Sequence, residues 1–138
     1  MKYYKLQPEV PGELLMETSL DTSTHPPKVL ILNVIFEAWT GDDLLDIFPC
    51  FFVTDRLKVL IEAKKLTGCS FEDFGLVIGE YAPPEASITK FWRMVPAACE
   101  RSADFSTNLK GYLIVSEAAL NLLKSLNVRA CDVSLIEE

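Results

Sequence analysis

The sequence predicts an α+β fold, with a mainly antiparallel sheet of about five or six strands and two main helices. Two segments, 55–66 and 117–126, carry apolar residues three and four positions apart, which is typical of a helix with one buried face. Most other apolar segments are short, rich in β-branched and aromatic residues, and bounded by glycine or proline, as strands are. Because these strands follow one another more often than they alternate with helices, α+β is favoured over a doubly wound α/β sheet.

Length and composition predict one folded domain over residues 1–138. A chain of 138 residues is long enough to bury one core and too short for two domains of ordinary size. With 49% hydrophobic and 24% charged residues, its composition is that of a folded protein and not of a disordered one. We therefore expect a single α+β domain.

The first helix is predicted from the residues at its two ends. After the β-favouring residues 51–53, Thr54 offers a hydroxyl that accepts from free N–H groups of the first turn. Asp55 places a carboxylate at the positive end of the helix dipole, and Gly68 is suited to the left-handed conformation that ends many helices. These residues predict a helix over 55–66 between two strands.

A second strand-helix-strand unit repeats this pattern. Residues 115–133 align without a gap on 53–71, so that Ser116 matches Thr54. Asn127 is the expected left-handed stop of the second helix. The two similar units, near 51–73 and 113–136, are explained either by a duplication or by the residue preferences that any strand-helix-strand unit shares.

The remaining elements are predicted from apolar runs between turns. Residues 28–39 form the most apolar segment, interrupted from 29 to 36 only by Asn33, so we expect a strand covered on both faces or near the sheet centre. Residues 19–27 and 96–110 are polar and turn-rich, and we expect loops there, with Phe105 as the anchor of the second. Further strands are expected over 2–6, 76–78, 88–95, 112–114 and 128–136.

Residues 42–48 predict a short helical turn with one acidic face. Asp42, Asp43 and Asp46 are interspersed with apolar residues in this segment. Three interpretations stay open: acids at a solvated helix start, a divalent-cation site, and a protein-binding patch. If Trp39 protrudes beside these acids, it forms an aromatic anchor with an acidic rim, which suits a basic partner. The candidate partner-binding residues are therefore Trp39, Asp42, Asp43 and Asp46.

Residues that carry catalytic or metal chemistry are sparse. The chain has four cysteines without a C-x-x-C pair and one histidine, His25, which precedes two prolines in a polar segment. Motifs for dinucleotides, nucleotide phosphates, hydrolase nucleophiles and zinc proteases do not occur in it. We expect no catalytic residue, no metal and no cofactor, and cysteines that act as buried small hydrophobes in a reducing compartment.

Charge and hydropathy restrict the partners. The net charge of −7 disfavours binding to nucleic acid or to anionic membranes and favours attraction to a basic protein. No apolar run approaches the roughly 18 residues that a membrane span needs, and the first residues do not form a secretory signal. We therefore expect a cytoplasmic protein.

Three segments of the chain resemble a known family. They are YYKLQPEVPGEL near the start, WTGDDLLDIFPCFFVTDRL at 39–57, and LIVSEAALNLLKSLNV at 113–128. Together they are similar to small bacterial immunity proteins found beside polymorphic contact-dependent toxins. The resemblance implies a cytoplasmic, non-enzymatic protein that binds and blocks a cognate toxin. It supplies no binding residues, so Trp39 and the three acids are proposed from their chemistry alone.

Two other classes of function stay open at this stage. A small enzyme would need carboxylates such as Glu37, Asp42 or Glu80 to converge in a cleft. A binding protein would instead present a flat acidic face with exposed aromatic residues. A scaffold domain would cover its apolar face with a second copy of itself.

Overall fold

The computed structural model describes residues 2–100 and 102–136. Within them the strands are β1 (Tyr3–Gln7), β2 (Gly12–Leu14), β3 (Ser19–Asp21), β4 (Lys28–Ile31), β5 (Asn33–Phe36), β6 (Leu44–Ile47), β7 (Cys50–Thr54), β8 (Cys69–Glu72), β9 (Gly75–Ile78), β10 (Phe91–Ala98), β11 (Phe105–Thr107), β12 (Leu113–Ser116) and β13 (Asp132–Ile136). The helices are α1 (Asp55–Ala63), α2 (Glu117–Lys124) and the short 3₁₀ helix η1 (Pro84–Ile88).

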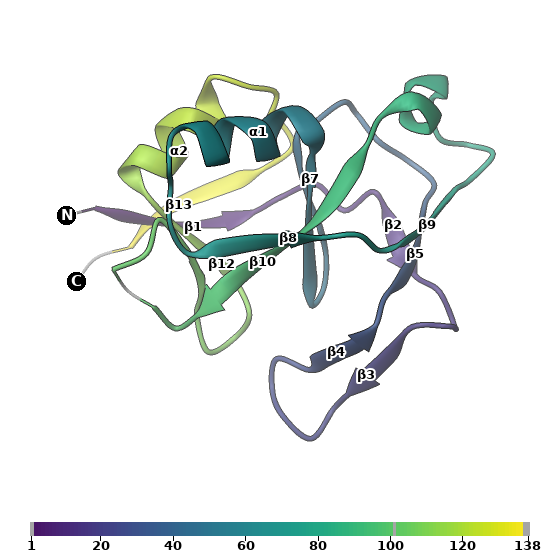
Figure 1. Ribbon diagram of the computed structural model, residues 1–138, viewed down its shortest axis with the longest axis horizontal. Helices are drawn as coiled ribbons and strands as arrows, with labels where there is room; N and C mark the ends of the chain where they lie inside the picture. Colours follow the sequence, from purple (N-terminus) through teal and green to yellow (C-terminus); the bar gives the residue numbers. More distant parts are fainter. Residues whose placement is uncertain (1, 101, 137–138) are drawn as a thin grey trace.

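The main sheet is curled and mostly antiparallel (Figure 1). Its strands follow the order β13-β1-β12-β11-β10-β7-β6, and β8 also pairs with β10. Strands β10 and β11 run parallel, whereas the other neighbours in this sheet run antiparallel. A three-stranded sheet, β2-β5-β9, and the β3–β4 hairpin complete the architecture. The predicted α+β class is confirmed, with more strands than the five or six expected.

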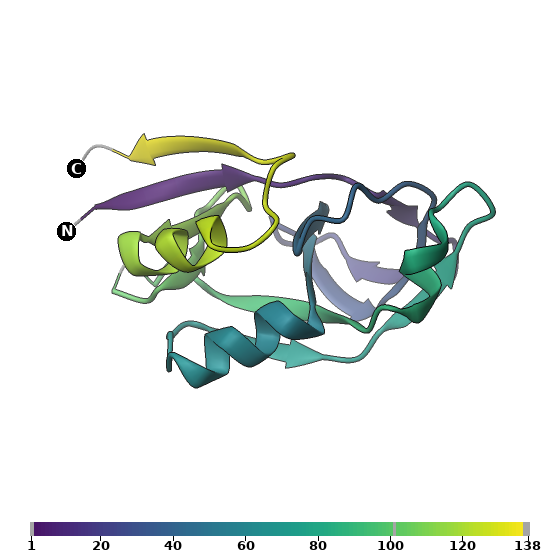
Figure 2. The same cartoon turned by 90° about the horizontal axis from the view of Figure 1, so that it is seen from above.

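The first core lies between the helices and the main sheet. In Figure 1 both helices lie along the upper side of the molecule, and Figure 2 looks down on them. Each turns an apolar face inward, through Leu57 and Ile61 in α1 and through Leu120 and Leu123 in α2. These side chains pack with buried residues of β1, β7, β10, β11 and β12. The helices therefore depend on the sheet for most of their stability, as short amphipathic helices do.

The second core is aromatic and lies on the other face of β7. Phe36 meets Phe52 and Phe91 edge to face, with ring centroids 5.6 and 5.1 Å away. Because side chains alternate along a strand, Phe52 points into this core while Phe51 and Val53 point into the first. β7 is therefore covered on both faces.

The expectation for residues 28–39 is wrong in its first half. The segment forms two strands, and Phe36 on β5 is fully buried, whereas Leu30 and Ile31 on β4 are each 58% exposed. β4 pairs with β3, which falls in a segment predicted to be a loop, and this hairpin extends away from the helices in Figure 1. An apolar run indicates a strand, but its burial depends on what the rest of the chain packs against it.

The predicted helical turn at 42–48 is also wrong. Its central residues form β6, which pairs antiparallel with β7, so that Leu44 lies opposite Val53 and Ile47 opposite Cys50. A short apolar run is compatible with either a helical turn or a strand. Pairing with β7 decides in favour of the strand.

Both predicted helices begin where expected, each directly after its hydroxyl residue. The predicted stop of α1 is wrong: the helix ends at Ala63 instead of 66, and Lys65, with φ of 56°, is the left-handed residue that follows it, while Gly68 has φ of 91° further along. Asn127 is not among the described residues with positive φ, so it is not the left-handed stop that was predicted; α2 ends at Lys124, and the residue after it, Ser125, is right-handed. Within the described part of the chain, no helix combines the length and the hydropathy that crossing a membrane requires.

The cysteines differ in burial. Cys50 is buried in the second core, Cys69 and Cys131 are half-buried, and Cys99 is exposed. The expectation of buried cysteines therefore holds fully for Cys50 alone. Burial raises the pKa of the Cys50 thiol to about 11, which keeps it protonated and apolar at neutral pH.

Candidate functional site

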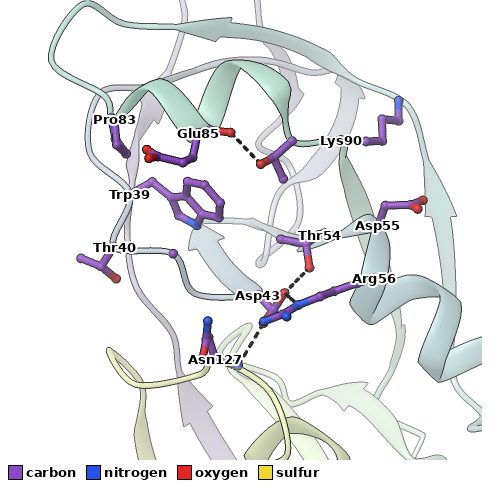
Figure 3. A pocket seen from close by; sticks show the side chains of 12 residues that line it. Trp39, Thr40, Asp43, Thr54, Asp55, Arg56, Pro83, Glu85, Lys90 and Asn127 are labelled. Carbon is purple, nitrogen blue, oxygen red and sulfur yellow. Dashed lines mark hydrogen bonds and ion pairs between the residues drawn. The ribbon is translucent and has the colours of Figure 1, made fainter.

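A pocket of about 510 Å³ opens beside Trp39 (Figure 3). It lies between the segment that follows β5, the start of α1, and η1 with its neighbouring residues. The residues that line it include Trp39, Thr40, Arg56, Glu85, Lys90 and Asn127. They come from four separate parts of the chain, so the pocket exists only in the folded protein.

Trp39 forms part of the pocket wall and is held in place by two contacts. Its indole Nε1 donates a hydrogen bond to the carbonyl oxygen of Asp42 at 2.8 Å. Its ring meets Phe91 edge to face, with centroids 5.2 Å apart and an interplanar angle of 81°. The side chain is half-buried, so part of the indole stays available to a ligand. Because the ring is already fixed, it loses little conformational entropy when a partner binds.

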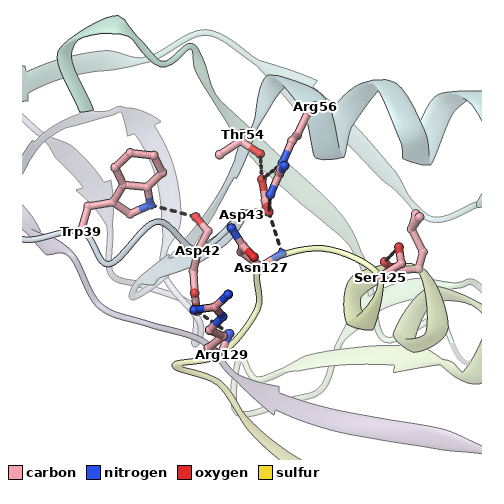
Figure 4. A network of polar contacts seen from close by, with 9 residues as sticks. Trp39, Asp42, Asp43, Thr54, Arg56, Ser125, Asn127 and Arg129 are labelled. Atoms are coloured by element: carbon pink, nitrogen blue, oxygen red, sulfur yellow. Dashed lines mark hydrogen bonds and ion pairs between the residues drawn. The ribbon is translucent and has the colours of Figure 1, made fainter. Parts of the chain in front are cut away.

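Asp43 is the centre of a polar network at the edge of the pocket (Figure 4). It is 1% exposed. Its Oδ1 accepts from Thr54 Oγ1 at 2.5 Å and from Arg56 Nε at 2.8 Å. Its Oδ2 accepts from Arg56 Nη2 at 2.6 Å and from the backbone N–H of Asn127 at 3.0 Å. The carboxylate thereby ties the start of α1 to the segment after α2.

These hydrogen bonds decide the charge of Asp43. Burial by itself raises the pKa of the carboxyl group. The bonds from Arg56, Thr54 and Asn127 outweigh burial and hold the pKa below its usual value. Asp43 is therefore a carboxylate at neutral pH, and it forms a salt bridge with Arg56.

The network corrects the role expected for Thr54. Its hydroxyl donates to Asp43, and no side-chain hydrogen bond caps α1. Asp55 still lies in the first turn, where its negative carboxylate interacts favourably with the positive end of the helix dipole. The sequence pattern correctly located the start of the helix but not the partner of the hydroxyl.

Asp42 is buried as well and makes a separate set of contacts (Figure 4). Its Oδ2 accepts from the backbone N–H groups of Arg129 at 2.9 Å and Ala130 at 2.7 Å. Asp42 and Asp43 therefore face inward, and the expected exposed acidic rim is wrong. Because residues 44–47 form a strand, there is no helical turn whose outer face could carry these acids to solvent.

Asp46 does not line the pocket. It lies on β6 opposite Phe51, and burial raises the pKa of its carboxyl group to about 6. The structure thus places Trp39 and Asp43 at the pocket, Asp42 behind it, and Asp46 elsewhere on the sheet. Of the four candidate residues, Trp39 alone presents a surface that a partner could contact there.

Several pocket residues were not predicted from the sequence. Arg56 and Asn127 reach Asp43 from 13 and 84 positions away, and Glu85 and Lys90 enter the pocket from the segment around η1. No local spacing marks these residues, because their contacts are made across the fold. The aromatic character of Trp39 was the one usable signal.

Among the residues that the structure describes, no group of three or more His, Cys, Asp or Glu side chains is arranged to hold a metal ion. What the pocket offers is a fixed indole surface, several charged side chains and room for a side chain of another molecule. Comparisons of this chain with models of protein families, with curated proteins and with solved structures found no match.

Proposed function

We propose that this chain is a non-enzymatic binding protein, an immunity protein that neutralises a cognate bacterial toxin by direct contact through the pocket beside Trp39. The observation that carries the proposal is the geometry of Trp39, an indole fixed by Asp42 and Phe91 at the wall of an open pocket. Fixed aromatic residues at recesses are typical centres of protein interfaces, because they bury a large area at a small entropic cost.

Exposed apolar side chains on the segment around η1, which contributes residues to the pocket, support a protein partner. Tyr81, just before η1, is 80% exposed, and Ile88, at the end of η1, is 86% exposed. Such side chains gain free energy when a partner removes them from water. Both residues lie within two positions of pocket-lining residues, Tyr81 before Pro83 and Ile88 before Thr89.

The charge of the chain supports a basic toxin. A net charge of −7 accelerates association with a positively charged protein, and the effect weakens as salt screens it. A nuclease is one kind of toxin with a positively charged surface, because it binds the phosphates of its substrate. The carboxylates of an acidic inhibitor would occupy the place of those phosphates. We place this encounter in the cytoplasm of the cell that makes the toxin.

A small enzyme is the second candidate, because the pocket is concave and lined by polar groups. Of the carboxylates considered for it, Glu37 and Glu80 are exposed, Asp42 is buried, and none of the three lines the pocket. Asp43, Asp55 and Glu85 do line it, but each oxygen of Asp43 accepts two hydrogen bonds from the protein itself, and Asp55 and Glu85 are exposed to solvent. We therefore rank the binding protein first.

The test is co-expression of the tagged protein with the products of neighbouring reading frames, followed by an affinity measurement on any stoichiometric complex. Tyr81→Ser should weaken binding about tenfold or more, since exposed aromatic residues at an interface centre often contribute that much. Leu109→Ser is the matched control, because Leu109 is 79% exposed but lies on a different segment, between β11 and β12, whereas Tyr81 lies two residues before the pocket residue Pro83. Both variants should unfold at the wild-type temperature.

Two results would contradict the proposal. One is a partner that binds wild type and Tyr81→Ser with equal affinity in low salt. The other is a catalytic turnover of a substrate held in the pocket, which would move the assignment to the enzyme. A complex that weakens with salt and with Tyr81→Ser, but not with Leu109→Ser, would support it.

A further inference from the structure

We propose that the pocket beside Trp39 receives a basic side chain, an arginine or a lysine of the partner protein, which lies against the Trp39 indole and pairs with Glu85. The inference rests on the proposed function for the identity of the partner, but the preference for a cation follows from the pocket itself.

The two basic residues of the pocket already have carboxylate partners. Arg56 forms two hydrogen bonds with Asp43, at 2.8 and 2.6 Å. Lys90 Nζ lies 2.5 Å from Asp73 Oδ1 and 4.3 Å from the centre of the Trp92 ring. Figure 3 shows the Lys90 side chain directed away from Trp39. Neither cation is therefore left without an anion to balance it.

Two acidic residues of the pocket have no cationic partner within the part of the chain that the structure describes. Among the described residues, none forms an ion pair or a side-chain hydrogen bond with the Glu85 carboxylate. Asp55 accepts a single hydrogen bond, from the neutral indole Nε1 of Trp92 at 2.9 Å. The charge left unbalanced in the pocket is thus negative, which favours a cationic ligand.

Glu85 and Trp39 lie on the same side of the pocket. Figure 3 shows the Glu85 side chain beside the indole of Trp39 and near Pro83. A cation there would meet the negative face of the indole and a carboxylate at the same time. Tryptophan is the best aromatic partner for a cation, and a guanidinium also stacks on it through its flat surface.

An anionic ligand is the alternative, because α1 begins at the pocket and its first turn has no side-chain cap. However, the carboxylates of Asp43 and Asp55 both lie at this helix start. They already supply the negative charge that the helix dipole favours, and they would repel a second anion. The arrangement around α1 therefore agrees with the preference for a cation.

The test uses the isolated protein, so it does not depend on finding a toxin. The indole N–H resonance of Trp39, assigned with Trp39→Phe, is followed by NMR while N-acetyl-arginine amide or N-acetyl-lysine amide is added. Uncharged N-acetyl-norleucine amide and inorganic phosphate are the comparison ligands. We expect saturable shifts at millimolar concentration with the two cations, smaller effects with norleucine amide, and none with phosphate.

Glu85→Gln should weaken arginine amide binding about threefold to tenfold, as expected for a partly exposed ion pair beside an aromatic ring. Glu17→Gln is the control, because Glu17 is an exposed acid in the turn between β2 and β3. The inference is overturned if Glu85→Gln binds like wild type, or if norleucine amide or phosphate produces the larger shift. A toxin whose binding depends on Tyr81 but not on Glu85 would overturn the inference while leaving the proposed function in place.

Discussion

The starts of α1 and α2 share one set of contacts but differ in whether the hydroxyl residue caps the helix. The shared contacts join each hydroxyl residue to an aspartate earlier in the chain. Thr54 donates to Asp43, 11 residues earlier, at 2.5 Å, and Ser116 donates to Asp104, 12 residues earlier, at 2.6 Å. In each case the backbone N–H of the hydroxyl residue also donates to the carbonyl of the same aspartate, at 3.1 and 2.9 Å.

The two aspartates also connect each helix start to the end of the other helix. Asp43 accepts from the backbone N–H of Asn127, which follows α2, at 3.0 Å. Asp104 accepts from the backbone N–H of Thr67, which follows α1, at 2.8 Å. The two strand-helix units are therefore joined by reciprocal contacts, whatever the origin of their similarity.

The difference lies in what else each aspartate binds. Ser116 also accepts from the backbone N–H of Ala119 at 3.1 Å and so caps α2 in the expected way. Thr54 does not cap α1, and its aspartate, Asp43, is buried and bound by Arg56 at the pocket. The comparison shows that the same local sequence pattern can begin a helix with a side-chain cap or without one. Which of the two forms depends on the tertiary partners of the hydroxyl group.

The largest expected effect is the contrast between Asp43→Ala and Asp104→Ala. Removing Asp43 leaves the buried Thr54 hydroxyl and the N–H of Asn127 without an acceptor, at a cost of about 3 kcal/mol in the free energy of unfolding. Asp104 is half-buried, so solvent can replace part of its bonding, and we expect about 1 to 2 kcal/mol. Urea denaturation measures both, and equal costs would show that burial does not distinguish the two sites.

Asp46 on β6 is a useful comparison, because the pKa of its carboxyl group is raised, whereas the pKa values of Asp43 and Asp104 are lowered. Burial raises its pKa to about 6 from an unfolded value of 3.8, so the folded state loses stability as pH rises from about 4 to 6 and keeps that penalty above 6. Asp46→Asn should therefore stabilise the protein by about 2 kcal/mol at pH 8, after allowance for partial exposure, and by little at pH 3.5. Denaturation of both proteins at the two pH values tests this, and a variant no more stable than wild type at pH 8 would contradict it.

A smaller effect is expected at the start of α2. Ser116→Ala removes one cap and one bond to Asp104, which should cost about 1 kcal/mol. Because Ser116 and Asp104 share a hydrogen bond, the double variant should cost less than the two single changes together, by about 0.5 kcal/mol. Strict additivity in a double-mutant cycle would mean that this bond contributes nothing to stability.

The smallest effect is expected on the exposed side of α1. Lys58 and Glu62 form an ion pair four residues apart, at 3.0 Å. Glu62→Gln should change the free energy of unfolding by about 0.3 kcal/mol, and less in high salt. A loss of more than about 1 kcal/mol in the free energy of unfolding, measured by thermal or urea denaturation, would contradict this. It would show that α1 depends on surface charge more than on its buried residues Leu57 and Ile61.

The predictions that the structure confirms concern features stabilised by interactions between residues close together in the sequence. The positions where both helices begin follow from apolar spacing and from the hydroxyl-acid pairs, which act within one turn of backbone. The buried anchor Phe105 lies in a polar segment, where one large aromatic residue has few alternatives to burial. The role of Trp39 as an anchor for a partner stays a prediction, and the structure shows only that its indole lies at the wall of a pocket.

The predictions that failed concern features that depend on partners far along the chain. Residues 44–47 are compatible with a helical turn, and only hydrogen bonds to β7 make them a strand. Asp42 and Asp43 look like surface acids, but backbone N–H groups after α2 hold them in the interior. Such contacts cannot be inferred from spacing, because nothing in the local sequence specifies which distant donor will be near.

By itself, the sequence determined the α+β class, the two helix starts, the acidic charge and the aromatic residue at the candidate site. The tertiary structure alone decided that Asp43 binds Arg56 and Asn127, that Thr54 leaves α1 uncapped, and that Glu85 lies beside Trp39 in a pocket. The physical reason is the range of the interactions. Backbone preference and amphipathic spacing act over a few residues, whereas burial, ion pairing and the shape of a pocket depend on segments that meet only when the chain has folded.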